Sequence, residues 1–166
     1  MKTKIEFLHM SVIRQMKYDE ISQKLGVNRK QLSEWWEELK EERKKISEVR
    51  TLFNRKKFQK VSFPEFYDWY QNQRNQCHYC GLTQGEIDIL IKDEKIKTRR
   101  LKTRGRKLEL ERRHPNLDYD QIDNLVLCCY WCNNSKSDEF TESEFGPIGI
   151  EIGKIWKNRL VSTKTK

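Results

Sequence analysis

Two pairs of cysteines have the spacing of a metal site. Cys77 precedes Cys80 by three positions, and Cys129 precedes Cys132 by the same interval. Two thiolates at this spacing in a tight turn can occupy two corners of a tetrahedron, so two pairs complete the coordination of one Zn²⁺. In a small chain without signs of secretion, such pairs indicate metal rather than disulfides. We therefore predict one structural Zn²⁺ per chain, with Cys128 left over as a small core residue.

The second pair lies in a stretch, residues 108–138, whose pattern predicts two strands and a helix. An alternating run at 108–111 indicates a half-buried strand. A polar, turn-rich segment follows, and an apolar run at 125–128 indicates the returning strand. The cysteine pair comes next, and the polar segment after it can form a helix. The predicted order is strand, loop, strand, metal knuckle and helix.

This stretch resembles the HNH endonucleases, whose ββα-metal core has the same order of elements. The residues that match the family motif are Asp123, Asn124, Leu125, Cys129, Cys132, Asn133 and Lys136. The segment after Cys132 also looks like the HNH domain of RNA-guided CRISPR nucleases. Glu111 and Arg112 stand where the family has Asp-His. The resemblance extends from the first cysteine pair to the C-terminal helix and implies a DNA-cleaving domain.

The resemblance also implies a catalytic site with one divalent cation, Mg²⁺ or another. Glu111 and Asn133 correspond to the family's metal-holding positions on the first strand and the helix. The cation would neutralise charge on the phosphate and stabilise the leaving 3′ oxygen. By the same correspondence, Asn124 would tie the loop together and orient the base, and Lys136 would face a phosphate.

The general base is the point at which this sequence departs from the family. Arg112 occupies the base position, and arginine does not take up a proton at neutral pH. His114 is two residues on, so in an extended chain it projects to the same face. Phage Holliday-junction resolvases look similar here, with Asp-His-Asp-His where this chain has residues 111–114. We therefore expect His114 to be the base and Arg112 to clamp the scissile phosphate. Two alternatives stay open: His114 only caps a turn before Pro115, or the site binds DNA without cutting it.

Residues 1–40 have the pattern of a helix-turn-helix unit that reads DNA. A helical apolar stripe covers residues 3–16, and Gly26 and Asn28 supply a turn and an N-cap. A third helix would bury Leu32, Trp36 and Leu39. Its outward residues near the N-terminus, where a recognition helix meets base edges, are Arg29, Lys30, Gln31 and Ser33. A three-helix bundle that only packs on its neighbour is the alternative.

The rest of the chain is assigned to a basic helical connector, residues 41–60, and a nuclease domain, residues 61–166. Phe66, Trp69 and Tyr70 form an aromatic stripe expected to pack under the zinc knuckle. The domain carries an insert, residues 81–107, whose basic end would track phosphates. The basic residues assigned to DNA binding there are Arg99, Arg100, Lys102, Arg104, Arg106 and Lys107. Pro147 is expected to start a final helix that packs through Ile148, Ile152, Ile155 and Trp156.

Composition fits a polyanionic partner. The formal net charge is +9, from 34 Lys and Arg against 25 Asp and Glu. We found no apolar run of membrane-spanning length and no signal-like N-terminus, so we expect a soluble, cytoplasmic protein without a membrane partner. The predicted fold class is α+β, a helical helix-turn-helix bundle followed by a small zinc-stapled ββα-metal domain with flanking helices.

The sequence therefore predicts an HNH-type Mg²⁺-dependent endodeoxyribonuclease that acts on double-stranded DNA and leaves 5′-phosphate and 3′-hydroxyl ends. A restriction, homing or mobile-element and phage context would suit it equally. The alternative function is a non-catalytic, zinc-containing DNA-binding regulator. Whether the chain acts as a monomer or a homodimer stays open.

Overall fold

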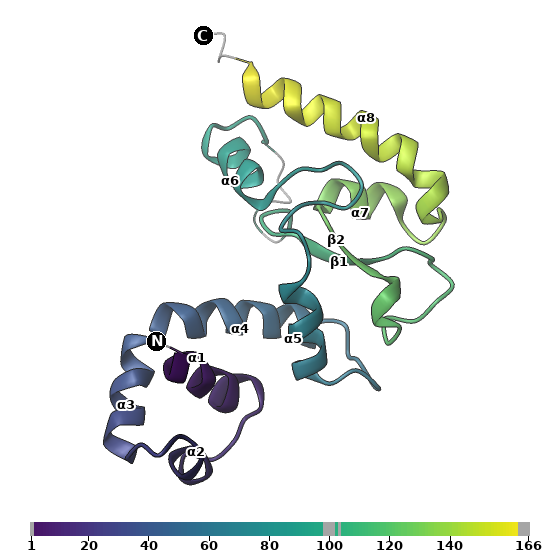
Figure 1. The fold of residues 1–166 in the computed structure, drawn as a ribbon. Coiled ribbons are helices and arrows are strands. Elements are labelled where there is room, and N and C mark those ends of the chain that lie inside the picture. Colours follow the sequence, from purple (N-terminus) through teal and green to yellow (C-terminus); the bar gives the residue numbers. More distant parts are fainter. Residues whose placement is uncertain (1, 98–101, 103, 163–166) are drawn as a thin grey trace. The chain divides into compact units, whose positions relative to one another are not determined.

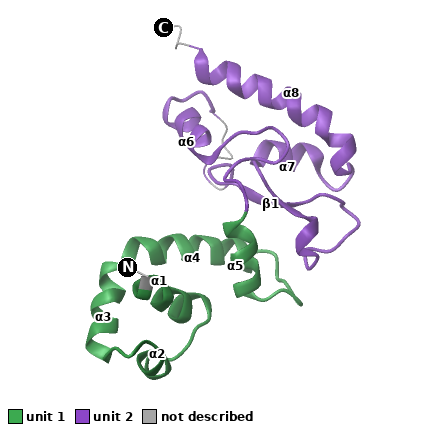
Figure 2. Cartoon of the chain, in the orientation of Figure 1, with its two compact units in different colours: residues 1–72 green, residues 73–166 purple. Residues whose placement is uncertain are grey.

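A computed structural model describes residues 2–97, 102 and 104–162 (Figure 1). The chain divides into two compact units, Met1–Asn72 and Gln73–Lys166 (Figure 2). The first is helical, and the second combines helices with a two-stranded sheet, so the fold is α+β. No helix in the described ranges is long and apolar enough to cross a membrane. Arg99 and Arg100 lie outside the described residues.

The first unit has a small apolar core. Phe7, Ile21, Leu32 and Trp35 are its buried members. Trp36 and Leu39, expected in this core, are only partly buried against it, and Trp35 takes the central place. The elements of the unit are α1 (Lys2–Leu8), the π-helix η1 (His9–Ile13), α2 (Tyr18–Leu25), α3 (Arg29–Glu38), α4 (Lys40–Asn54) and α5 (Phe63–Gln71).

The turn between α2 and α3 forms as the sequence predicts. Gly26 ends α2 in the left-handed conformation, with φ of 66°, which glycine adopts without a Cβ penalty. Asn28 begins α3, and its side-chain oxygen accepts a hydrogen bond from the Gln31 amide at 2.9 Å. The N-terminal turn of α3 is exposed to solvent.

Helix α5 packs within the first unit and corrects one expectation. A capping box between Ser62 and Glu65 starts it. The Phe66 ring lies 5.3 Å from that of Phe53 in α4 and 5.4 Å from that of Phe58, measured between centroids. The residue predicted to pack under the cysteines thus packs in an aromatic cluster of the other unit.

The second unit contains the predicted hairpin and the helix after it. Strands β1 (Glu109–Arg112) and β2 (Leu125–Cys128) pair antiparallel, with Leu110 opposite Leu127 and Glu111 opposite Val126. All four residues of β2 are buried. The other elements are α6 (Gln84–Lys92), the 3₁₀ turn η3 (Ile122–Asn124), α7 (Tyr130–Lys136) and α8 (Glu142–Val161).

Helix α8 begins and packs differently from the prediction. The capping box of Thr141 and Glu144 starts it, so Pro147 lies inside the helix. Ile148 and Ile155, expected to be packed, are 43% and 52% exposed. Trp156 is buried as predicted, and the rest of the buried face is formed by Phe145, Gly149 and Gly153.

Two glycines bring α8 close to the backbone of the first cysteine pair. A Cβ at Gly153 would lie 2.5 Å from the carbonyl oxygen of Cys80, and one at Gly149 would lie 2.7 Å from Cβ of Tyr79. Neither distance leaves room for a methyl group. The apolar periodicity of the helix could not reveal this close approach, because the two residues that allow it, Gly149 and Gly153, have no side chains.

We expect Gly153→Ala to destabilise the second unit by about 1–3 kcal/mol, because the added methyl group must push the knuckle backbone away. Gly85→Ala, in α6 of the same unit, is the matched control, because its Cβ would meet nothing within 4 Å. Alanine is the better helix former, so this control should gain about 0.5–1 kcal/mol. Urea denaturation measures both; equal effects of the two substitutions would contradict the close approach.

Candidate metal centre and catalytic site

The four predicted cysteines meet in one buried cluster. The ligand atoms of Cys77, Cys80, Cys129 and Cys132 all lie within 4.8 Å of one another. The Sγ atoms of Cys80 and Cys129 are 3.7 Å apart. Tetrahedral coordination with a Zn–S bond near 2.3 Å requires sulfurs about 3.8 Å apart, so the cluster has the dimensions of a Zn²⁺ site.

The electrostatics of the cluster also fit a bound cation. The pKa of Cys77 is lowered by hydrogen bonding with the neighbouring thiols, that of Cys128 first. The pKa of Cys132 is raised, first by hydrogen bonding with Cys129 and then with Cys77. Closely spaced, buried thiols therefore resist ionising together unless a cation lies among them. Four thiolates need a dication among them, and soft sulfur donors select zinc over Mg²⁺.

Short backbone contacts attach the first knuckle to the sheet. The Cys77 amide donates to the Leu82 carbonyl at 2.8 Å, and the His78 amide donates to the Leu127 carbonyl of β2 at 2.8 Å. The His78 imidazole pairs with Glu142, at the start of α8, instead of with the cysteines. The grouped metal-ligand atoms are therefore the four cysteine sulfurs, and His78 is not among them.

Cys128 adjoins the cluster and lies outside the group of four. Its thiol is fully buried and donates to the carbonyl of Cys129 at 3.3 Å. Burial raises its pKa well above the ordinary value, so it stays a neutral thiol. It is a core residue, as predicted.

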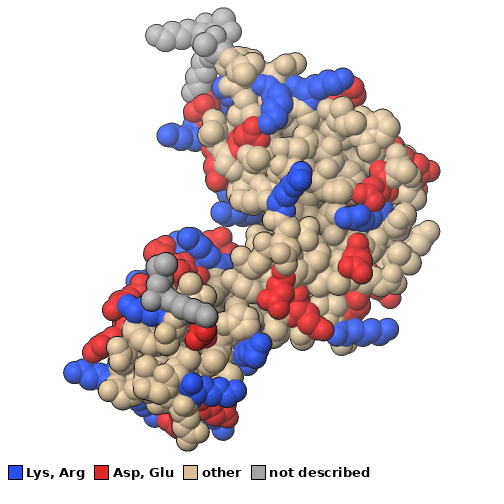
Figure 3. All heavy atoms as spheres, in the orientation of Figure 1, with Lys and Arg blue, Asp and Glu red and all other residues tan. Residues whose placement is uncertain are grey.

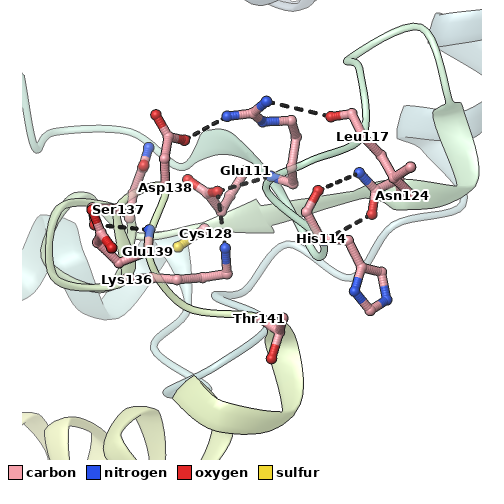
Figure 4. A network of polar contacts seen from close by, with 12 residues as sticks. Glu111, His114, Leu117, Asn124, Cys128, Lys136, Ser137, Asp138, Glu139 and Thr141 are labelled. Atoms are coloured by element: carbon pink, nitrogen blue, oxygen red, sulfur yellow. Dashed lines mark hydrogen bonds and ion pairs between the residues drawn. The ribbon is translucent and has the colours of Figure 1, made fainter.

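Acidic side chains of β1 face polar side chains of α7 in two pairs. Glu111 is 4% exposed, and its Oε1 lies 3.5 Å from Nζ of Lys136, which is fully buried (Figure 4). Asn133 donates from Nδ2 to Oε2 of Glu109 at 2.8 Å. The structure thus brings the two expected cation-holding residues, Glu111 and Asn133, to one β1–α7 interface but pairs each with another residue.

Glu109 is a residue of the β1–α7 interface that the sequence analysis missed. Arg104 holds both of its carboxylate oxygens, with Nε donating to Oε1 at 3.0 Å, and its guanidinium lies 5.0 Å from the ring centroid of Tyr130. Alternation along a strand places residues 109 and 111 on one face, and that signal could have identified Glu109. Arg104, assigned from sequence to phosphate contacts, makes a contact within the protein.

Arg112 bridges the loop and the end of α7. Its guanidinium contacts the Asp138 carboxylate and donates to the Leu117 carbonyl at 3.3 Å (Figure 4). It also lies 4.9 Å from the ring centroid of Tyr119. The Arg112 side chain is only 18% exposed, whereas that of Asp138 is 81% exposed. The arginine is therefore fixed by the fold, and its carboxylate partner is open to solvent.

Asn124 closes the loop between the strands. Its Oδ1 accepts from the His114 amide at 2.9 Å, and its Nδ2 donates to the His114 carbonyl at 3.1 Å. The Arg113 amide donates to the Asn124 carbonyl at 2.8 Å. This buried asparagine thus fixes the backbone of His114, which agrees with the loop-tying role expected for it.

The His114 side chain lies beyond the end of β1. Strand β1 ends at Arg112, so the alternation that predicted a common face stops before residue 114. The imidazole is exposed and points away from the Glu111–Lys136 pair in Figure 4. It makes no hydrogen bond or ion pair with any described residue. His114 thus has a fixed backbone and an open side chain.

The residues assigned to DNA contacts are exposed, in two separate units. On α3 these are Arg29, Lys30, Gln31 and Ser33, and before β1 they are Lys102, Arg104, Arg106 and Lys107. Gln84 anchors the second group: it donates to the Arg106 carbonyl at 2.7 Å and accepts from the Leu108 amide at 3.0 Å. In the face drawn in Figure 3, basic and acidic side chains alternate over both units.

The chain matches a known protein by structure and not by sequence family. No family model and no curated protein matches the sequence. A solved structure of PacI, a rare-cutting HNH restriction endonuclease, matches with a TM-score of 0.52 and 25% sequence identity. The match covers 70% of this chain and 79% of that one. This chain has an HNH-like fold. Its HNH-like element is the β1–β2 hairpin with α7, supported by the four-cysteine cluster.

Elemental analysis should find about one zinc per chain. Cys132→Ser should lose the metal and unfold the second unit, because binding and folding of such sites are one equilibrium. Cys128→Ala is the matched control, because Cys128 is equally buried but outside the four-cysteine group. It should keep the zinc and its far-UV circular dichroism. A folded, metal-free wild-type protein would rule out this centre.

Proposed function

We propose that this protein is a metal-dependent DNA endonuclease that hydrolyses phosphodiester bonds and leaves 5′-phosphate and 3′-hydroxyl ends. The observation that carries the proposal is the structural likeness to an HNH restriction endonuclease over 70% of the chain. The loop-closing Asn124 at the expected place in the hairpin adds to it. A restriction role is suggested by that relative, and homing or mobile-element roles fit the same chemistry.

A hard divalent cation such as Mg²⁺ fits the donors at the β1–α7 interface. Glu111, Glu109 and Asn133 offer carboxylate and amide oxygens, the ligands that such cations prefer. A bound cation there would neutralise phosphate charge and stabilise a leaving oxygen. The two carboxylates already have basic partners, Lys136 and Arg104, so the site balances its own charge.

His114 is the proposed general base. Its backbone is held by Asn124 on both sides, while its imidazole is open to water. An exposed imidazole can accept a proton from water, and the His114 side chain would turn toward Glu111 to do so beside a bound substrate. Histidine is also the side chain that changes protonation near neutral pH.

Arg112 is the proposed phosphate clamp. A guanidinium offers planar, paired donors that match a phosphate as well as a carboxylate. Its present partner Asp138 is highly exposed, so a DNA phosphate can replace that carboxylate without unfolding the loop. Leu117 and Tyr119 would keep the guanidinium in place during the exchange.

Target selection is proposed to reside in α3, with support from the basic segment before β1. The exposed N-terminal turn of α3 follows a glycine turn and an asparagine cap, the arrangement of a recognition helix. Contacts of the nuclease core would be mainly to the DNA backbone and would carry little sequence information.

In a plasmid-cleavage assay with Mg²⁺, His114→Ala should slow cutting by on the order of 100-fold or more, the scale of a general base. Its DNA affinity should change little, because backbone contacts dominate such interfaces. Arg112→Ala should reduce both rate and affinity, and Glu111→Ala should abolish cutting. His9→Ala, a histidine of the other unit, is the control and should cut normally.

Two results would change this assignment. Near-normal cutting by His114→Ala would transfer the base role to another group and leave the nuclease intact. Absence of cutting by the wild type across a broad substrate library, with DNA binding retained, would favour the non-catalytic regulator.

Recognition by α3 is tested in the full chain. Replacing Arg29, Lys30 and Gln31 together by alanine should weaken binding to the preferred site while non-specific nicking survives. Replacing Lys44 and Lys45, exposed on α4, gives a charge-matched control that should keep site preference. Unchanged preference in the α3 variant would place recognition in the second unit.

A further inference from the structure

The pair of Glu111 and Lys136 is enclosed to an unusual degree. Lys136 has no exposed surface, Glu111 is 4% exposed, and the charged atoms are 3.5 Å apart. Lysine is almost never fully buried, because removing an ammonium from water costs more than a single ion pair returns. A buried ion pair is therefore weak evidence of a stabilising interaction, and a functional reason for burying Lys136 has to be considered.

The backbone beside Lys136 is strained, which adds to that expectation. Ser137 directly follows the lysine with φ of 49° and ψ of −153°, a conformation that belongs almost to glycine alone. The strained residue directly follows the last residue of α7. Strain of this kind persists where the surrounding structure imposes it, and it gathers at functional sites.

The pair of Arg104 and Glu109 at the same interface is more exposed to solvent. Arg104, the partner of Glu109, has a side chain that is 45% exposed and can swing into solvent. Lys136 has no such path without local movement of α7. The cation nearest to Glu111 is therefore built into the fold, and Glu111 is the carboxylate at the family's metal-holding position.

We propose that the Lys136 ammonium is an internal counter-ion that competes with a divalent cation for Glu111. The inference rests on the proposed function in that it assigns the cation to the Glu111 carboxylate. Lys136 is then a positioning residue that lowers metal affinity and keeps Glu111 ordered while no cation is bound. Binding of the dication requires the ammonium to move away, since two cations cannot share the same carboxylate oxygen without strong repulsion.

The test is calorimetric titration of the full, zinc-loaded chain with Mn²⁺, without DNA. Lys136→Met keeps the length and helix preference of the side chain and removes its charge. We expect it to bind Mn²⁺ at least about tenfold more tightly than wild type, the scale by which groups beside a ligand alter metal affinity. Mn²⁺ should also raise its melting temperature more than that of wild type, since the dication replaces the missing charge.

Two variants give the controls. Lys154→Met, on the exposed face of α8, should leave Mn²⁺ affinity unchanged. The double variant Glu111→Gln and Lys136→Met should lose the added affinity, because its carboxylate is gone. Mn²⁺ affinity in Lys136→Met that equals or falls below wild type, with zinc content and circular dichroism intact, would overturn the proposal.

A second measurement uses the wild type and covers the case in which Lys136→Met does not fold. Reductive methylation followed by mass spectrometry reports which lysines are reachable. Lys136 should resist labelling without Mn²⁺ and become labelled with it, while Lys154 is labelled in both states. Continued protection of Lys136 at saturating Mn²⁺ would also overturn the proposal. Plasmid cleavage is measured separately, so the counter-ion proposal can be rejected without rejecting the nuclease proposal, and the reverse.

Discussion

The four-cysteine cluster is the constraint on which the second unit depends. The unit has one two-stranded sheet, and a two-stranded hairpin is marginal in water by itself. The cluster joins residues 77–80 to the end of the hairpin and to the start of α7, which begins with Cys129 as its N-cap. A metal bound there would supply cross-links between these segments. It would also fix where α7 begins, and with it the position of Asn133 and Lys136 against β1.

The β1–α7 interface differs from the four-cysteine cluster in how its charges are arranged. At the cluster, four thiols lie together, and four thiolates would need a dication among them. At the β1–α7 interface, each acid has a base: Arg104 for Glu109 and Lys136 for Glu111. The charge of ionised thiols calls for a metal from outside the chain, whereas the carboxylates of the second site are balanced by basic side chains of the chain itself.

Much of this could be predicted from sequence where the signal is local. Cysteine spacing, the hairpin and the Asn28 cap depend on residues close together in the chain, and each was found. The packing of α8 could not be, because it depends on how closely Gly153 approaches Cys80. The orientation of His114 was missed for a related reason: alternation predicts a face only while the strand lasts, and β1 ends at Arg112. The partner of Lys136 depends on the register between β1 and α7, which neither segment encodes alone.

The closure of the β1–β2 loop by Asn124 bears on how such a protein can diversify. Because this asparagine joins the backbone on both sides of the loop, contacts at the base of the loop hold the register of the hairpin. Doubling the length of a flexible loop costs only about 0.6 kcal/mol in closure entropy. Substitutions there can alter the exposed surface of the loop while the hairpin keeps its register, provided that Leu117 and Tyr119 keep their contacts with Arg112.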